Sequence, residues 1–460
     1  MTINAKTLYD PNLEKDNCGF GLIAQRNGKR SRKLVKKSIL GLTSMTHRGA
    51  IGADGKTGDG CGLLFDLNHS FFKLKVDREL DVELPDFFAV AQLFHKNDID
   101  FYYSSISKFL NSQDLEIAVT RSVPVNNEVL GKIARQNLPN ISQVFITSKN
   151  TNLNKERFEA CLLQARKFIE EKFDNDEEFY VCSMSTQTIV YKGLMLPSAI
   201  DEFYLDLKDK KFEAKICLFH QRFSTNTLPR WHLAQPFRLL AHNGEINAIR
   251  GNRNWAKARK SKFSTALIPE ITTFKNLVNE KGSDSSALDN MIEILVKGGI
   301  NTFRALRMVL PPAWQNIHMM DPEIKSFHEY NSMHMEAWDG PAGIVMSDGR
   351  WAICLLDRNG LRPARYQIDN EGYVTIASEI GVFPQDESNF ITKGRIGAGG
   401  IFAIDTETGE LIDQSIIDNK LKEGKPYRTW LRSKAKYLES SLYNYAGTVS
   451  YTHLRAHETV

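Results

Sequence analysis

The chain has 460 residues, of which 42% are hydrophobic and 25% charged, a composition typical of a globular protein. Its formal net charge of +4 is too small to indicate binding to nucleic acid or to an anionic membrane. No apolar run is long enough to cross a membrane, and no cysteines form a CxxC pair that could bind zinc or an iron–sulfur cluster. We therefore expect two or three domains or one large one, free thiols in a reducing compartment, a cytoplasmic location and no metal site.

The first 17 residues are polar and lack the apolar core of a secretory signal, so they fit a short propeptide or a frayed tail. The run from Cys18 to Ala24 then predicts a strand. If the chain is cut after Asn17, Cys18 carries both a thiol and a free α-amine, which supplies a nucleophile and its base in one residue. An α-amine has a pKa near ~7.7–8.0, so a useful fraction is neutral at cellular pH. The ordinary alternative for Cys18 is a buried strand residue.

A short amphipathic helix over 34–42 is predicted to deliver His47, Arg48 and Gly49. The glycine-rich stretch from Gly49 to Gly60 resembles a phosphate-binding loop but fails its spacing, because five residues rather than four separate Gly49 from Gly55. No apolar strand leads into it either. These glycines instead indicate tight turns where the backbone passes close to a site.

The rest of the pattern predicts many strands, with helices in separate blocks rather than in regular alternation. Helices are expected at 155–172, 284–297 and 302–310, with Cys161 in the core and Ser283, Asp284 or Ser285 as the cap of the second. Strands are expected at 61–65, 86–94, 115–120, 143–147, 179–185, 214–219, 342–347, 351–356, 372–378 and 400–404. This arrangement favours an α+β protein with layered antiparallel sheets.

The sequence changes character after about residue 405, where it becomes charged and helix-prone. The final residues, 449–460, continue no earlier pattern and resemble the translation of a sequencing adapter, which we exclude as an artefact. We expect a propeptide at 1–17, a main domain at 18–410, a linker or the start of another domain at 411–446, and a non-native tail at 447–460. The chain is then a truncated piece of a longer protein.

Three polar clusters contain residues that could carry chemistry. Arg222, at the end of the predicted strand 214–219, could clamp a carboxylate through two parallel hydrogen bonds, although a surface arginine is the ordinary alternative. The Asn243 amide beside the Gly244 N–H could form a two-donor oxyanion pocket, although Asn-Gly is also a common hairpin turn. Asp284 could accept a substrate ammonium, or serve only as a helix cap. Together with Cys18, these groups are those needed to bind a free amino acid and attack its side-chain amide.

These clusters together resemble one enzyme family. The chain resembles the class II glutamine amidotransferases in five strings: Cys18-Gly19, His47-Arg48-Gly49, Arg222-Phe223-Ser224-Thr225, His242-Asn243-Gly244-Glu245 and Ser283-Asp284-Ser285. The longer strings narrow the resemblance to the large subunits of bacterial glutamate synthases: Phe219 to Thr227, Pro311-Pro312-Ala313-Trp314 and Met333-His334-Met335-Glu336. The similarity runs in order over roughly residues 8 to 440.

The resemblance implies a four-layer αββα Ntn-hydrolase fold with two antiparallel sheets. It assigns Cys18 as the nucleophile after removal of residues 1–17, and Asn243 with Gly244 as the oxyanion hole. It further implies that Arg222 holds the carboxylate of L-glutamine, that Asp284 holds its ammonium, and that Thr225 and Arg48 position the substrate and the surroundings of the nucleophile. The implied reaction of this piece is hydrolysis of glutamine to glutamate and ammonia.

For the whole enzyme the resemblance implies a further synthase domain that adds the ammonia to 2-oxoglutarate. That domain would hold FMN and an iron–sulfur cluster, and none is expected in this piece. The implied partners are a small subunit or another electron donor, NADPH or ferredoxin, and an oligomer is expected. Two alternatives stay open: another class II amidotransferase, or a non-catalytic, amidotransferase-like regulatory module.

Overall fold

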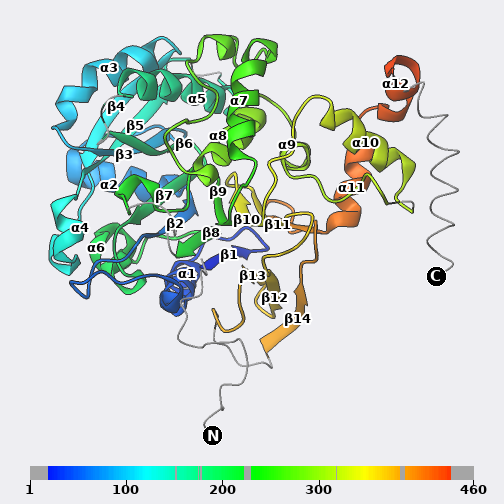
Figure 1. Ribbon diagram of the computed structural model, residues 1–460. Coiled ribbons are helices and arrows are strands. Elements are labelled where there is room, and N and C mark those ends of the chain that lie inside the picture. Colours follow the sequence, from blue (N-terminus) through cyan, green and yellow to red (C-terminus); the bar gives the residue numbers. More distant parts are fainter. Residues whose placement is uncertain are drawn as a thin grey trace, which may run out of the picture.

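Two antiparallel sheets lie face to face at the centre of the protein, and helices cover their outer faces (Figure 1). In this computed structural model the described residues are 19–150, 153–174, 176, 179–221, 229–317, 319–383 and 389–436. Cys18, Arg222 and Thr225 lie outside these residues, as do the stretches 1–17 and 447–460.

The first central sheet has seven strands, and the amino-terminal strand of the described chain lies in its middle. Its order is β14 (Phe390–Arg395), β12 (Arg365–Asp369), β13 (Tyr373–Ala377), β1 (Gly19–Gln25), β8 (Ile216–Gln221), β2 (Cys61–Asp66) and β7 (Thr188–Gly193). Every residue of β1, β8 and β2 is buried, because both faces of the sheet are covered. Successive side chains alternate between the faces, so that Leu22 faces the second sheet while Ile23 faces the helical layer.

The second central sheet has five strands. Its order is β16 (Leu411–Ile412), β15 (Ile401–Asp405), β11 (Trp351–Leu356), β10 (Ala342–Ser347) and β9 (Leu240–Gly244). Strand β9 pairs only with β10 among the described strands, so it forms an edge of this sheet. The two sheets share a core to which β1 contributes Phe20 and Leu22 and to which β10 and β11 contribute Val345 and Cys354.

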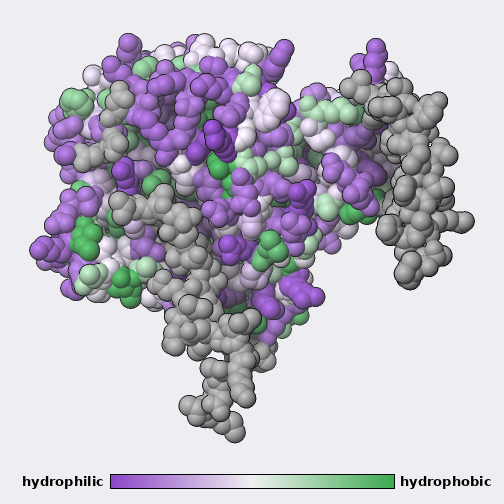
Figure 2. All heavy atoms as spheres, in the orientation of Figure 1, coloured by the Kyte–Doolittle hydropathy of each residue, from purple (hydrophilic) through white to green (hydrophobic). Residues whose placement is uncertain are grey.

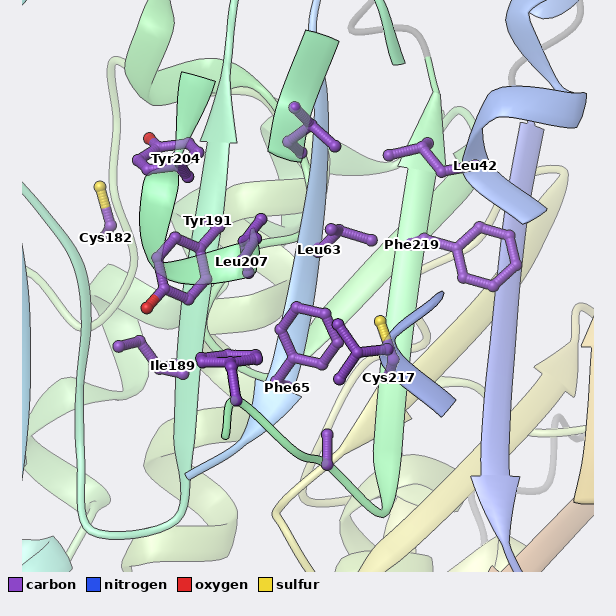
Figure 3. Packing of buried hydrophobic residues seen from close by; sticks show 14 of the residues in the cluster. Leu42, Leu63, Phe65, Cys182, Ile189, Tyr191, Tyr204, Leu207, Cys217 and Phe219 are labelled. Atoms are coloured by element: carbon purple, nitrogen blue, oxygen red, sulfur yellow. The ribbon is translucent and has the colours of Figure 1, made fainter. Parts of the chain in front are cut away.

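Helices close the sandwich on both sides. Helix α1 (Arg32–Ser44) packs Leu34, Val35 and Leu42 on the outer face of the first sheet. Figure 3 shows Leu42 near Phe219 in this core, which also contains Phe65. Helix α8 (Asp284–Lys297) packs Leu288, Met291 and Ile292 on the outer face of the second sheet. The resulting order of helix, sheet, sheet and helix confirms the predicted four-layer αββα fold.

A third sheet of four strands stands beside the sandwich. Its order is β4 (Leu115–Ser122), β5 (Asn140–Ser148), β3 (Ala89–His95) and β6 (Tyr180–Ser185). Helices α3 (Ile99–Asn111) and α5 (Lys155–Lys172) cover one face, and the other face joins the core beneath the first sheet. Its strands were predicted, but their separation into a sheet of their own was not, because alternation within a strand does not identify its neighbours.

The remaining helices connect or flank these layers. They are α2 (His69–Leu80), α4 (Lys132–Gln136), α6 (Ile200–Phe203), α7 (Ile249–Arg259), α9 (Thr302–Val309), α10 (Pro322–Ser332), α11 (Gln414–Glu423) and α12 (Tyr427–Lys434). Helices α11 and α12 contact α10 and contribute Ile417, Leu421 and Tyr427 to the core below the second sheet. On the face in Figure 2, hydrophilic side chains predominate and apolar ones are scattered. Within the described part of the chain, no helix combines the length and apolarity needed to span a bilayer.

Candidate active site

The amino end of β1 and the carboxyl end of β8 lie side by side in the first sheet. Gly19 stands opposite Gln221, and Gly19 follows Cys18 in the chain while Gln221 precedes Arg222. The sheet therefore places the residue that follows the predicted nucleophile opposite the residue that precedes the predicted carboxylate clamp.

Arg48 lies beside the start of β1. A Cβ atom built on Gly19 would stand 3.3 Å from Cγ of Arg48. The Arg48 guanidinium donates to Oε2 of Glu379, from Nε at 2.8 Å and from Nη2. Burial alone would raise the pKa of Glu379, but hydrogen bonds from Arg48 and His47 hold this pKa below its usual value. The sequence did not predict that Glu379 would pair with Arg48. A half-buried arginine usually has an acidic partner, but the sequence alone does not identify which residue it is.

Strand β9 ends in the predicted oxyanion pair. Asn243 stands opposite Gly343 of β10, and Gly244 stands opposite Ala342. Gly244 has φ of +143°, and a Cβ atom there would stand 1.8 Å from the carbonyl oxygen of Pro341. Only glycine fits this conformation and this close approach. The backbone at Gly244 is thus fixed against the segment that leads into β10.

Asp284 is the first residue of α8, and its side chain reaches the loop after β9. Ser283 is the N-cap, because its hydroxyl accepts from the backbone N–H of Ser286 at 3.1 Å. The Asp284 carboxylate is therefore not needed as the cap. Its Oδ2 accepts from the N–H of Ile246 at 2.7 Å, and its Oδ1 accepts from the N–H of Ser285 at 2.7 Å. The structure thus bonds Asp284 to a residue that lies only two positions after Gly244 along the chain.

Two histidines join the ends of β8 and β9. Nε2 of His220 is 3.2 Å from the carbonyl oxygen of His242, which also accepts from Nε2 of Gln235 at 3.2 Å. Burial lowers the pKa of His220 to about 3, with a smaller effect from His242, and burial also lowers the pKa of His242. Both rings are therefore neutral near pH 7. The sequence predicted neither role, since His242 was considered only as part of a motif.

The ring of Phe20 links the two sheets at the same place. A Cβ atom on Gly343 would stand 2.9 Å from Cε1 of Phe20. Gly343 is the strand partner of Asn243, and Phe20 follows Gly19. The beginning of β1 and the end of β9 therefore lie against each other across the sandwich core, which brings all the described members of the predicted set (Arg48, Asn243, Gly244 and Asp284) to one region.

Two of the three strings that resemble those of the glutamate synthases lie elsewhere. Residues 311–314 and 335–336 line a cavity of about 460 Å³, together with Arg307, His328, Arg358 and further residues of α9 and α10. None of Arg48, Asn243, Gly244 and Asp284 lines it. These strings therefore mark a feature that is separate from the candidate active site.

No group of three or more histidine, cysteine, aspartate or glutamate side chains that could hold a metal ion occurs in the described part of the chain. The five cysteines within that part are all buried free thiols, at positions 61, 161, 182, 217 and 354. Burial raises the pKa of each of these thiols, to about 12 for Cys182.

Comparison with known proteins reveals relatives that are much longer than this chain. The glutamate synthase (NADPH) large chain of Bacillus subtilis is 38% identical over 444 residues, which covers 94% of this chain and 29% of that protein. The glutamate synthase (NADH) of Saccharomyces cerevisiae is 37% identical over 444 residues, which covers 93% of this chain and 21% of that protein. The chain thus spans between a fifth and a third of the length of these relatives.

Among solved structures, the chain is similar to a glutamine phosphoribosylpyrophosphate amidotransferase from Bacillus subtilis, with a TM-score of 0.37 and 13% identity over 86% of this chain and 49% of that one. The family described as class II glutamine amidotransferases matches residues 18–430, which is most of the chain and begins at Cys18. This protein therefore belongs to the class II glutamine amidotransferase family.

Proposed function

We propose that this chain is the glutaminase part of a glutamate synthase and hydrolyses L-glutamine to L-glutamate and ammonia. One observation carries the proposal: Asp284, from the start of α8, is hydrogen-bonded at 2.7 Å to Ile246, two residues after the Asn243–Gly244 pair. In this proposal Asp284 accepts the substrate ammonium, and the Asn243–Gly244 pair, two residues before Ile246, donates to the oxyanion. A substrate with an α-ammonium and a side-chain amide fits this combination.

In the proposed reaction Cys18 acts as the amino-terminal residue. Its α-amine takes the thiol proton, and the sulfur forms a bond to the amide carbon of glutamine. The carbonyl oxygen becomes an oxyanion that the Asn243 side chain and the Gly244 N–H stabilise. The carbon–nitrogen bond then breaks, the proton passes from the α-amine to the leaving nitrogen, and ammonia and a glutamyl thioester result. Water attacks the thioester, and glutamate leaves as the thiol is restored.

The other predicted residues bind the substrate. Arg222 is proposed to hold the α-carboxylate through two parallel hydrogen bonds, and Asp284 to hold the α-ammonium. Both oxygens of Asp284 accept backbone hydrogen bonds, so the carboxylate has a fixed orientation before substrate arrives. Thr225 and Arg48 are proposed to position the substrate and the nucleophile. Arg48 is itself oriented by Glu379.

The test is intact mass spectrometry before and after treatment with an electrophilic glutamine analogue, combined with an assay for ammonia release. We expect loss of residues 1–17 and a single adduct on Cys18, because the five described cysteines are buried thiols of raised pKa. A Cys18→Ser variant should stay unlabelled, and the matched control Cys161→Ser should label like the wild type. A chain that retains Met1, resists labelling and releases no ammonia would contradict the proposal.

In the longer protein the ammonia would pass to a synthase domain and be added to 2-oxoglutarate. The FMN and the iron–sulfur cluster that such a synthase uses are proposed to bind outside this chain, since no two of its cysteines are spaced as a CxxC pair. We also propose a cytoplasmic location, an oligomeric assembly, and NADPH through a small subunit, or ferredoxin, as the electron donor. The limits at 17, 410 and 446 remain proposed domain boundaries.

A further inference from the structure

The carboxylate of Asp284 is connected to both sides of the Asn243–Gly244 pair. On the carboxyl side, Oδ2 accepts from the N–H of Ile246 at 2.7 Å. On the amino side, the Ser285 hydroxyl lies 3.2 Å from Oδ1 of Asp284 and 2.7 Å from Nδ1 of His242, which directly precedes Asn243. Asp284 is therefore linked to residues on both sides of the Asn243–Gly244 pair, directly to Ile246 and through Ser285 to His242.

The Ser285 hydroxyl has one proton to share between these two neighbours. A carboxylate can only accept, whereas a neutral imidazole donates from one nitrogen and accepts at the other. Both contacts are satisfied when Nδ1–H of His242 donates to the hydroxyl and the hydroxyl donates to Asp284. The three groups then form a directed chain from the strand β9 to the carboxylate.

The residues linked to Asp284 are held in place by burial and by further hydrogen bonds. His242, Ser285 and Ile246 are all buried. The N–H of His242 donates to Oε1 of Gln235 at 2.7 Å, and Asp289, one helical turn beyond Ser285, accepts from the N–H groups of Leu239 and Leu240. A change in the orientation of the Asp284 carboxylate is therefore transmitted to β9 rather than absorbed by loose side chains.

We propose that Ser285 is a positioning and specificity-determining residue that couples recognition of the substrate α-ammonium at Asp284 to the alignment of the Asn243–Gly244 oxyanion donors. This inference rests on the proposed glutaminase function. An ammonium that pairs with Asp284 fixes the carboxylate and, through Ser285 and His242 on one flank and Ile246 on the other, fixes the donors. Binding energy from a part of the substrate that does not react is thereby used at the reacting carbonyl. An amide without the α-ammonium is bound more weakly and is also turned over more slowly once bound.

The experiment compares L-glutamine with 4-carbamoylbutanoate, the same amide without the α-amino group, and measures kcat and KM separately for the whole chain. In the wild type we expect the missing amino group to lower kcat as well as to raise KM. In Ser285→Ala, kcat for glutamine should fall toward the value for the analogue. The ratio of the two kcat values should then shrink about tenfold, as is typical for groups in one hydrogen-bonded network.

Ser286→Ala is the matched control, because Ser286 lies in the same turn, is equally buried, and bonds to Ser283 and Asn279 rather than to His242. It should keep the wild-type ratio, and Ser285→Thr, which retains the hydroxyl, should restore it. Thermal unfolding of each variant checks that the fold is intact. Equal loss of kcat on both substrates in Ser285→Ala, or no loss on either, overturns the coupling while leaving the glutaminase function in place. A wild-type chain that releases no ammonia from glutamine overturns both.

Discussion

Arg48 and Glu379 form an ion pair at the start of β1, where the guanidinium donates two hydrogen bonds to one carboxylate oxygen. Glu379 follows Ser378, whose N–H donates to the carbonyl oxygen of Phe20 and whose hydroxyl accepts from the Phe20 N–H. The ion pair thus connects the segment after α1, which contains Arg48, to the end of β13 beside β1. Its electrostatics should influence both the stability and the geometry of this end of the sheet.

The pH dependence of stability provides a test of this ion pair. Because the pKa of Glu379 is lowered in the folded protein, its contribution is fully present above the ordinary pKa of glutamate and is lost as the pH falls through the lowered value. Glu379→Gln should therefore lower the midpoint of thermal unfolding near neutral pH, and the difference from the wild type should shrink on acidification. The exposed Glu128, changed to Gln, is the control and should show little effect at any pH. A difference that is constant with pH would contradict the lowered pKa.

Asn243→Ala tests the proposed oxyanion hole. Loss of one oxyanion donor typically costs about 2.7–4 kcal/mol in the transition state, so kcat for ammonia release should fall by about 100-fold or more. KM should change much less, because the donor acts mainly on the transition state. Steady-state kinetics with glutamine measure both values. Asn27→Ala, in the exposed turn after β1, is the control and should keep wild-type kinetics. Wild-type turnover in Asn243→Ala would show that the assignment is wrong.

Gly244→Ala tests whether the backbone at the same site requires glycine. The added Cβ would combine a φ of +143° with a 1.8 Å approach to the Pro341 oxygen, so the backbone has to move. We expect a loss of about 1–3 kcal/mol of unfolding free energy, typical of a strained backbone position, together with loss of activity. Gly251→Ala is the control, because that helical glycine has open space around its Cβ position and should gain about 0.5–1 kcal/mol. Denaturant unfolding of both variants measures the contrast, and equal effects at the two glycines would refute the argument.

The parts of the fold that the sequence predicted well are those with local causes. Helices α5 and α8 have the predicted limits, 155–172 and 284–297. Their apolar periodicity and the Ser283 cap are local features, which can be recognised from neighbouring residues alone. Strand β9 was not predicted, since it has five residues, ends in Asn243 and Gly244, and is buried because α8 lies on one face and β1 and β8 lie on the other. The bond between His242 and Ser285 joins residues 43 positions apart, and no local pattern indicates such a contact.

The candidate site divides in the same way. Its residue types and motifs were visible in the sequence, so Arg48, Asn243, Gly244 and Asp284 could be named. What orients these residues was not visible, because Glu379, Ser285 and Ile246 become neighbours only after the sheets have paired and α8 has packed on β9. The structure places only Arg48, Asn243, Gly244 and Asp284 among the described residues, and the roles assigned to all seven predicted site residues, Cys18, Arg222 and Thr225 included, remain predictions.

Asp289 provides a last test, since it ties the middle of α8 to the beginning of β9. Its Oδ1 accepts from the backbone N–H groups of Leu239 and Leu240, at 2.9 and 3.2 Å. Burial raises the pKa of Asp289, and the neighbouring Glu293 raises it further, while Arg238 opposes the shift. The folded protein therefore binds this proton more tightly than the unfolded chain does, and the unfolding free energy should fall as the pH rises through the raised pKa.

Asp289→Asn keeps an oxygen that can accept both hydrogen bonds but removes the titrating group. The thermal midpoint of the wild type, measured relative to this variant, should therefore decrease as the pH is raised from about 5 to about 8. Because both proteins share every other titrating side chain, subtracting the two pH profiles isolates the effect of Asp289 and of its coupling to Glu293. A difference that grows with pH would mean that the pKa of Asp289 is lowered in the folded state, and that Arg238 and the two backbone donors outweigh the burial of the carboxylate.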